Sequence, residues 1–242
     1  MKTIYRRYGK IVEITEVQKV PFKVRSSAPR ERRNVYGARR KDNIRRTKKI
    51  CVRRVFSALE MFGSPLLLTL TFAGDASDAA YANDSLRYFQ MRLRAKYPKA
   101  LSLFIPELSP RGRIHFHGLL FNVPLHLGDT RKGRRLISKG EERKTRTLAK
   151  LWGEGFVDAQ QTDGSGALAH YISKYITKGA GEVMFNAMRL LRISHGFPQE
   201  IVFRGSLAEG MARRFASQEP LSEWSGENDY SGKITRKTYL SE

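Results

Sequence analysis

The sequence predicts an α+β fold in which a central antiparallel sheet packs beside helices. The first observation is a short apolar run, Leu66–Phe72, which is bounded by turn-forming residues and is typical of a buried central strand. The second is a pair of strand-like segments, 101–107 and 113–121, which are joined by a Pro-Arg-Gly turn and predict an antiparallel hairpin. The third is that helical patterns stand between the strands, so sheet and helices form one layered fold.

The amino-terminal part of the chain is strongly basic. Residues 1–25 alternate weakly between apolar and charged side chains, which favours a short strand or hairpin. Residues 26–54 are rich in Arg with almost no apolar periodicity, which indicates a mobile basic arm or a helix that faces phosphate; a solvated face is the plain alternative. We therefore expect residues 1–60 to be a basic extension that binds DNA.

The helices and the last strand of the expected catalytic domain, residues 61–215, follow from local signals. One helix begins near Asp78 or Asp84, either of which can cap it, and ends at Lys96 before a proline. The other expected elements are a helix over 141–152 with Leu148, Leu151 and Trp152 toward the core, a strand over 155–161, and a helix over 164–178 that Gly179 ends. Residues 216–242 are polar, and after about Pro220 they predict a loose tail or a late addition.

Composition narrows the class of protein. Lys and Arg number 45 against 23 Asp and Glu, and the net charge of +22 favours a polyanionic partner such as nucleic acid. Residues 1–54 hold 19 of the basic residues and only four of the acidic ones. The single cysteine, Cys51, excludes an internal disulfide and fits a reducing compartment. No apolar run approaches the roughly 20 residues of a membrane span, and no signal peptide is evident, so we expect no membrane association and a cytoplasmic location.

Two histidines and a carboxylate form a candidate metal site. In a strand, residues i and i+2 lie on the same face, so His115 and His117 project together while Phe116 faces away. The predicted hairpin places Glu107 on the adjoining strand, within reach of both. Such a set leaves open positions for water and a phosphate oxygen, and we expect Mg²⁺ or Mn²⁺. The alternative is a pair of partly exposed polar residues; His126 and His170 lack such pairing and are taken as structural or substrate-facing.

Two tyrosines form a candidate nucleophile pair. On a helix, Tyr171 and Tyr175 lie one turn apart on one face. Lys174 and Lys178 each follow a tyrosine by three residues, and a nearby ammonium is expected to lower the pKa of a phenol and to stabilise charge on a phosphate. The alternative is an ordinary amphipathic helix with tyrosines at the edge of the core and solvated lysines.

Three motifs in this order resemble those of rolling-circle replication initiators of the HUH endonuclease superfamily. They are Leu67–Phe72 as the first-motif strand, His115–His117 as the metal motif and Tyr171–Lys178 as the nucleophile helix. The two tyrosines resemble the initiators of small single-stranded-DNA phages of the microvirus type. The resemblance spans residues 64–180 and implies the HUH fold, a palm resembling that of RNA-recognition modules.

The resemblance also implies a reaction. His115 and His117, with Glu107, would hold the metal ion, and Tyr171 or Tyr175 would attack the phosphate of a single-stranded or hairpin origin. The products would be a 5′-phosphotyrosine and a 3′-hydroxyl that a host polymerase extends, with Lys174 and Lys178 assisting. The sequence contains no Gly-x-x-x-x-Gly-Lys-Ser/Thr loop, so a host helicase is the expected unwinding partner. The oligomeric state is not predicted.

Three alternatives stay open from the sequence. A relaxase or a single-strand transposase would share the metal and tyrosine motifs. A non-catalytic basic nucleic-acid-binding protein would use the same charge with the motif residues as core and surface. A ribosomal or structural RNA-binding protein would also explain the charge, but it would not explain the paired histidines and the paired tyrosines.

Overall fold

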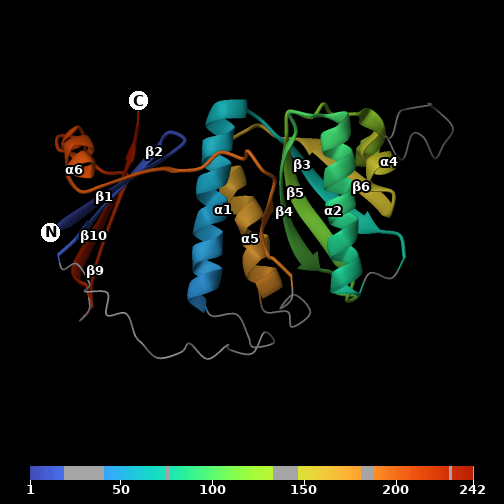
Figure 1. Ribbon diagram of the computed structural model, residues 1–242, viewed down its shortest axis with the longest axis horizontal. Helices are drawn as coiled ribbons and strands as arrows, with labels where there is room; N and C mark the ends of the chain where they lie inside the picture. The colour runs from blue at the N-terminus through green and yellow to red at the C-terminus, as the bar shows by residue number, and fades with distance from the viewer. Residues whose placement is uncertain (19–40, 75–76, 133–146, 181–187, 229–230, 242) are drawn as a thin grey trace. The chain divides into compact units, whose positions relative to one another are not determined.

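The computed structural model describes residues 1–18, 41–74, 77–132, 147–180, 188–228 and 231–241 (Figure 1). The chain forms two compact units, residues 33–197 and residues 1–32 with 198–242. Each unit contains one five-stranded antiparallel sheet, and the described residues include five α-helices, which confirms the predicted α+β class. No helix in these described ranges is both long and apolar enough to cross a membrane.

The sheet of the larger unit contains the predicted strands. Its order is β6 (Gly155–Gln161), β3 (Leu66–Phe72), β5 (Ile114–Phe121), β4 (Leu101–Leu108) and β7 (Arg192–Ile193). The hairpin of β4 and β5 is confirmed, and the Ser109 N–H donates to the Arg113 carbonyl across its turn at 2.8 Å. The run over β3 is central as predicted, although its side chains alternate between full and partial burial instead of being buried on both faces.

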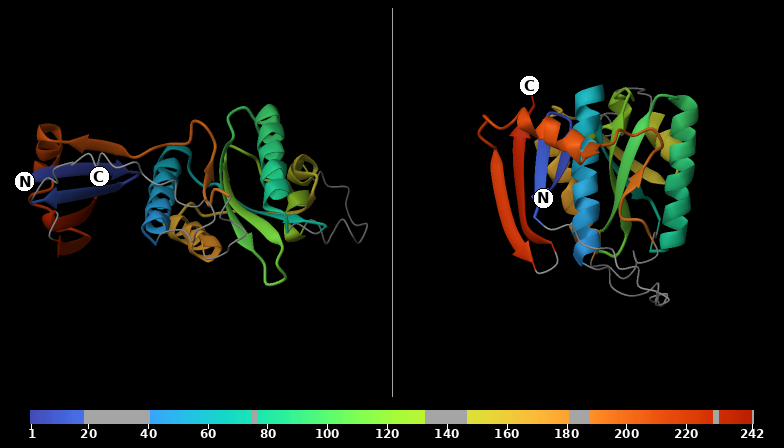
Figure 2. Two further views of the ribbon diagram at one scale, coloured as in Figure 1. Left: turned by 60° about the horizontal axis from the view of Figure 1, so that its bottom comes forward. Right: turned by 60° about the vertical axis from the view of Figure 1, so that its left-hand side comes forward.

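Helices cover the two faces of this sheet. Helices α1 (Lys41–Phe62) and α5 (Ala167–Ala180) lie side by side over one face, and α2 (Ala79–Lys96) and α4 (Thr147–Trp152) lie over the other (Figures 1 and 2). Of the two predicted caps for α2, the structure uses Asp78, whose carboxylate accepts the Ala80 N–H at 2.8 Å. The basic segment is helical from residue 41, and residues 19–40 lie outside the described part.

The aromatic core beneath α2 is centred on Trp152. Its ring meets the rings of Phe72, Phe89 and Phe116 at centroid distances of 4.9, 5.8 and 6.4 Å, mostly edge to face. The indole N–H donates to the Thr71 carbonyl at 3.1 Å, so this buried polar group is satisfied. The predicted inward side of α4 is therefore confirmed, and the packing fixes β3 and β5 from below while leaving their other face to the histidines.

Gly118 is required by the packing of the hairpin. A Cβ at this position would overlap the Phe104 ring and would lie 2.8 Å from the Leu103 carbonyl oxygen. Gly118→Ala is therefore expected to lower the free energy of unfolding by about 1–3 kcal/mol in chemical denaturation. Gly74→Ala is the matched control, because nothing lies within 4 Å of the added methyl, and a change within about 0.5 kcal/mol is expected. Equal stability of the two variants would contradict this reading of the core.

Cys51 lies in α1 with no exposed surface. Burial disfavours the thiolate and raises the pKa of Cys51 to about 12. The thiol therefore stays neutral in the folded protein at pH 8, and any stability that depends on this falls only above its unfolded pKa of about 8.5. We expect a chromogenic disulfide reagent at pH 8 to label the thiol only after guanidinium is added. Rapid stoichiometric labelling of the native protein would show that the core opens locally.

The smaller unit is built from both ends of the chain. Its sheet has the order β8 (Ile201–Arg204), β1 (Lys2–Tyr8), β2 (Ile11–Val17), β10 (Gly232–Leu240) and β9 (Ser222–Asn228). Helix α6 (Ser206–Arg213) contributes Ala208 to a small core with Tyr5, Val12, Ile14, Phe215 and Tyr239. The expected amino-terminal hairpin is confirmed.

The expectation of a loose carboxy-terminal tail is wrong, because β10 pairs along its length with β2 and with β9. The two compact units cut across the predicted ranges 1–60, 61–215 and 216–242. Helix α1, expected within the extension, belongs to the larger unit. The assignment of catalysis to residues 61–215 stays a prediction.

Candidate active site

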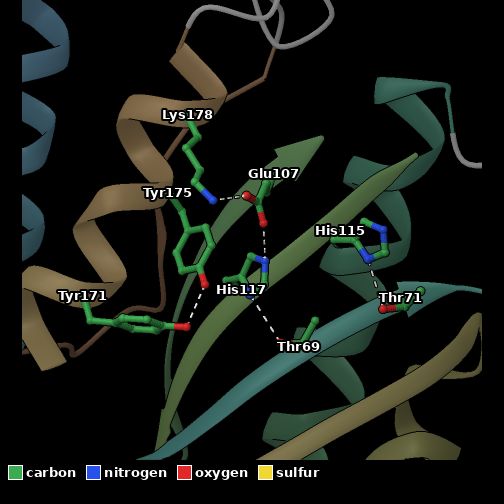
Figure 3. Close-up of polar contacts among 8 residues, drawn as sticks. All are labelled: Thr69, Thr71, Glu107, His115, His117, Tyr171, Tyr175 and Lys178. Atoms are coloured by element: carbon green, nitrogen blue, oxygen red, sulfur yellow. Dashed lines mark hydrogen bonds and ion pairs between the residues drawn. The ribbon is translucent and has the colours of Figure 1, made fainter. Parts of the chain in front are cut away.

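The candidate metal ligands lie together on the sheet face that α5 partly covers (Figure 3). Glu107 on β4 is directly opposite His115 on β5, and His117 follows two residues along the same strand. Directly paired residues of an antiparallel sheet point to one face, so the three side chains share it. The predicted placement of Glu107 beside both histidines is therefore confirmed, whereas its role as a ligand stays a prediction.

Two threonines orient the histidines, and the sequence reasoning missed them. Thr71 on β3 pairs with His115, and its Oγ1 lies 3.0 Å from His115 Nδ1; Thr69 Oγ1 lies 3.3 Å from His117 Nδ1. A hydroxyl can donate or accept, so it serves either imidazole tautomer and leaves Nε2 toward the site. The signal was present in the sequence, because the two threonines alternate with leucines in Leu66–Phe72 and so share one strand face.

Glu107 is held by two charged or polar partners (Figure 3). His117 Nε2 lies 2.6 Å from Glu107 Oε2, and Lys178 Nζ donates to Oε1 at 2.9 Å. Burial favours the neutral carboxyl, but the hydrogen bonds and charges of Lys178 and His117 outweigh it and lower the pKa of Glu107. The carboxylate is therefore ionised at neutral pH, which is the form that binds a cation.

The donor set suits a hard divalent metal ion by chemistry. Burial lowers the pKa of His115 and of His117, although the Glu107 charge opposes the shift, so both imidazoles favour the neutral form that metals bind. Within the described ranges, no three His, Cys, Asp or Glu side chains meet in a ready metal-binding group. Glu107 and His117 instead contact each other, and this hydrogen bond would have to open for both to hold an ion.

The two tyrosines meet at their hydroxyl groups, as Figure 3 shows. Tyr171 Oη lies 2.8 Å from Tyr175 Oη, which confirms that they share one face of α5. The Tyr175 ring stacks on the His117 imidazole with a centroid distance of 3.9 Å and an interplanar angle of 13°. Tyr171 is 43% exposed, so it is open to a large substrate. Both phenols are thus within one side-chain length of the candidate metal ligands.

The expected effect of the lysines on the phenols is wrong for Tyr175. Burial, the hydrogen bond with Tyr171 and the Glu107 charge raise the pKa of Tyr175 instead of lowering it. Lys178 lies 5.3 Å from the Tyr175 ring centroid, but its ammonium is paired with Glu107. Lys174 is exposed on α5, and the described contacts include no hydrogen bond between it and Tyr171. The lysines are therefore placed to meet a phosphate more than to ionise a phenol.

The other histidines of the sequence analysis lie elsewhere. His126 Nε2 is 2.9 Å from the Tyr97 hydroxyl, and the His170 ring packs edge-on against Phe56 at 6.0 Å. These contacts are structural in kind.

Comparison with known proteins agrees with the position of the site. No curated protein and no solved structure matches the chain. Residues 65–180, just under half of the 242 residues, match the model of a family of replication-associated proteins of the ORF2 type. The matched segment begins immediately before β3 and ends with α5, and so contains every candidate ligand and nucleophile named above. This segment of the chain is therefore similar to the replication-associated proteins of that family.

Proposed function

We propose that the protein is a metal-dependent DNA nicking and joining endonuclease that acts on a single-stranded or hairpin origin in rolling-circle replication. The observation that carries the proposal is the meeting of two phenol oxygens, 2.8 Å apart, beside the His117 imidazole and the Glu107 carboxylate. The similarity of residues 65–180 to replication-associated proteins supports it, and the charge of +22 supplies affinity for DNA phosphates.

The proposed reaction is a transesterification. The Oη atom of Tyr171 or Tyr175 attacks the scissile phosphorus, a phosphorus–oxygen bond to the phenol forms, and the bond to the 3′ oxygen breaks. The phenol proton is lost and the departing 3′ oxygen gains a proton, so the products are a 5′-phosphotyrosine and a free 3′-hydroxyl. The number of phosphoester bonds is unchanged, so the reverse attack by a 3′-hydroxyl joins strands without ATP.

The chain's own residues have separate parts in this reaction. Glu107, His115 and His117 would hold Mg²⁺ or Mn²⁺, which would polarise the scissile phosphate when bound. Thr69 and Thr71 fix the imidazoles by their Nδ1 contacts. Lys178 keeps Glu107 ionised, and with Lys174 it offers positive charge to the phosphate.

Two nucleophiles at one point explain how a circle can be released. While one tyrosine carries the 5′ end, the other can cut the regenerated origin, and the new 3′-hydroxyl then attacks the first adduct. The exposed position of Tyr171 and the stacked position of Tyr175 bring both oxygens to the same place without movement of α5. A host polymerase would extend the 3′-hydroxyl, and a host helicase would open the duplex.

The experiment that tests the proposal uses end-labelled single-stranded DNA from the protein's own replicon on a denaturing gel, with Mn²⁺ or with chelator. A metal-dependent band that carries both protein and label supports the proposal. Tight binding without an adduct on any origin-containing strand would overturn it in favour of a non-catalytic nucleic-acid-binding protein. Adducts confined to transposon ends or transfer origins would favour a transposase or a relaxase of the same chemistry.

A further inference from the structure

Phe156 is a large apolar side chain that is exposed beside the candidate active site. It lies on β6, the edge strand of the larger unit's sheet, and 58% of its surface is accessible. Its strand neighbours Val157 and Ala159 are buried on the opposite face of the sheet. Because side chains alternate along a strand, Phe156 lies on the same face as Asp158 and Gln160, and it is not part of the core.

The strand register places this ring in one row with the candidate metal ligands. Phe156 pairs with Thr71, Thr71 pairs with His115, and His115 pairs with Glu107. Directly paired residues point to the same face, so the row runs from the exposed ring to the carboxylate across four strands. Helix α5 packs on β4 and β5, at the Glu107 end of this row. The Phe156 end is the accessible one.

We propose that Phe156 is a stacking platform for a nucleobase close to the scissile phosphate, which adds a DNA-positioning residue to the proposed nicking reaction and rests on that function. His115 lies two strand spacings away, about 10 Å. A strand with stacked bases advances about 3.4 Å per nucleotide, so the stacked base lies within about three nucleotides of the cut. Base stacking on an aromatic ring accepts any sequence and fits a site that must hold single-stranded DNA.

The surroundings of Phe156 favour a base over a protein partner. On its face of the sheet the ring stands among polar side chains, with Thr71 beside it across the strands and Asp158 next along β6. A protein-docking surface is expected to present a contiguous apolar patch of several hundred Å². A single flat ring with polar neighbours matches a nucleobase, which offers an apolar face and polar edges.

The test compares Phe156→Ala with Phe156→Trp on origin-strand oligonucleotides, with chelator present to prevent cleavage. Phe156→Ala is expected to weaken binding about 5- to 100-fold, whereas Phe156→Trp keeps the affinity and shows fluorescence quenching on binding. The dependence of affinity on salt should not change, because no phosphate contact is lost. Tyr88→Ala is the control, since Tyr88 is an equally exposed aromatic, 47%, on α2 at the other side of the sheet.

An abasic scan of the oligonucleotide distinguishes stacking from a structural role. One abasic position should weaken binding by wild-type protein as much as Phe156→Ala does, and it should cost the variant nothing further. Additive effects at every position, or an altered oligomeric state with unchanged affinity, would overturn the inference while adduct formation stands. If wild-type protein forms no adduct, the proposed function fails, and this inference fails with it.

Discussion

Replacing Tyr171 and Tyr175 together by Phe is expected to abolish the protein–DNA adduct, with a loss of nicking on the order of 10⁴-fold or more. Phenylalanine keeps the ring that stacks on His117 and removes only the hydroxyl groups, whose mutual hydrogen bond is solvent-exposed. The fold and the affinity for DNA should therefore be unchanged. Denaturing gels measure the adduct, and fluorescence anisotropy of a labelled origin strand measures binding.

The single variants separate the two roles. Tyr171→Phe and Tyr175→Phe should each retain one cleavage but lose closure of a circle, because the second transfer needs the other phenol. Tyr88→Phe is the matched control, since it removes a phenol hydroxyl from α2 and should change neither step. Alternation would be wrong if both single variants nicked and closed as wild type does. Retained adduct in the double variant would move the nucleophile to another residue.

Local pattern was sufficient to predict the parts of the site that lie close in the sequence. The Pro-Arg-Gly turn fixed the register of one hairpin, and that register alone places Glu107 opposite His115. Helical spacing likewise places Tyr171 and Tyr175 on one face. In both cases a short segment determines the geometry, because strand and helix periods are set by the backbone.

Contacts between distant segments were not predictable in this way. The sequence places Lys178 beside Tyr175, but not Glu107 across from them both, and this carboxylate reverses the expected shift in the pKa of Tyr175. The pairing of β10 with β2 joins residues more than 200 positions apart, and no local period marks it. The tail reads as polar because its charged side chains dominate, although Ile234 and Thr235 are β-branched residues that suit a strand.

Substituting His117 by Ala is expected to reduce metal-dependent cleavage by at least about 10³-fold while binding of DNA stays within about threefold. Cleavage falls because a candidate ligand and the partner of both Glu107 and Tyr175 is lost together. Binding stays because attraction to phosphates is spread over 45 Lys and Arg residues. Adduct yield and anisotropy, measured on the same preparation, separate the two effects.

A Mn²⁺ titration decides whether His117 acts as a ligand or only as a support for Tyr175. In the first case the variant should need a higher Mn²⁺ concentration for half-maximal cleavage, because Glu107 and His115 still offer two donors. In the second case the concentration dependence should match that of wild type at a lower maximum. His195→Ala is the control, since that imidazole is exposed and outside the site, and its titration should be unchanged. Full cleavage by His117→Ala at low Mn²⁺ would remove this residue from the proposed metal centre.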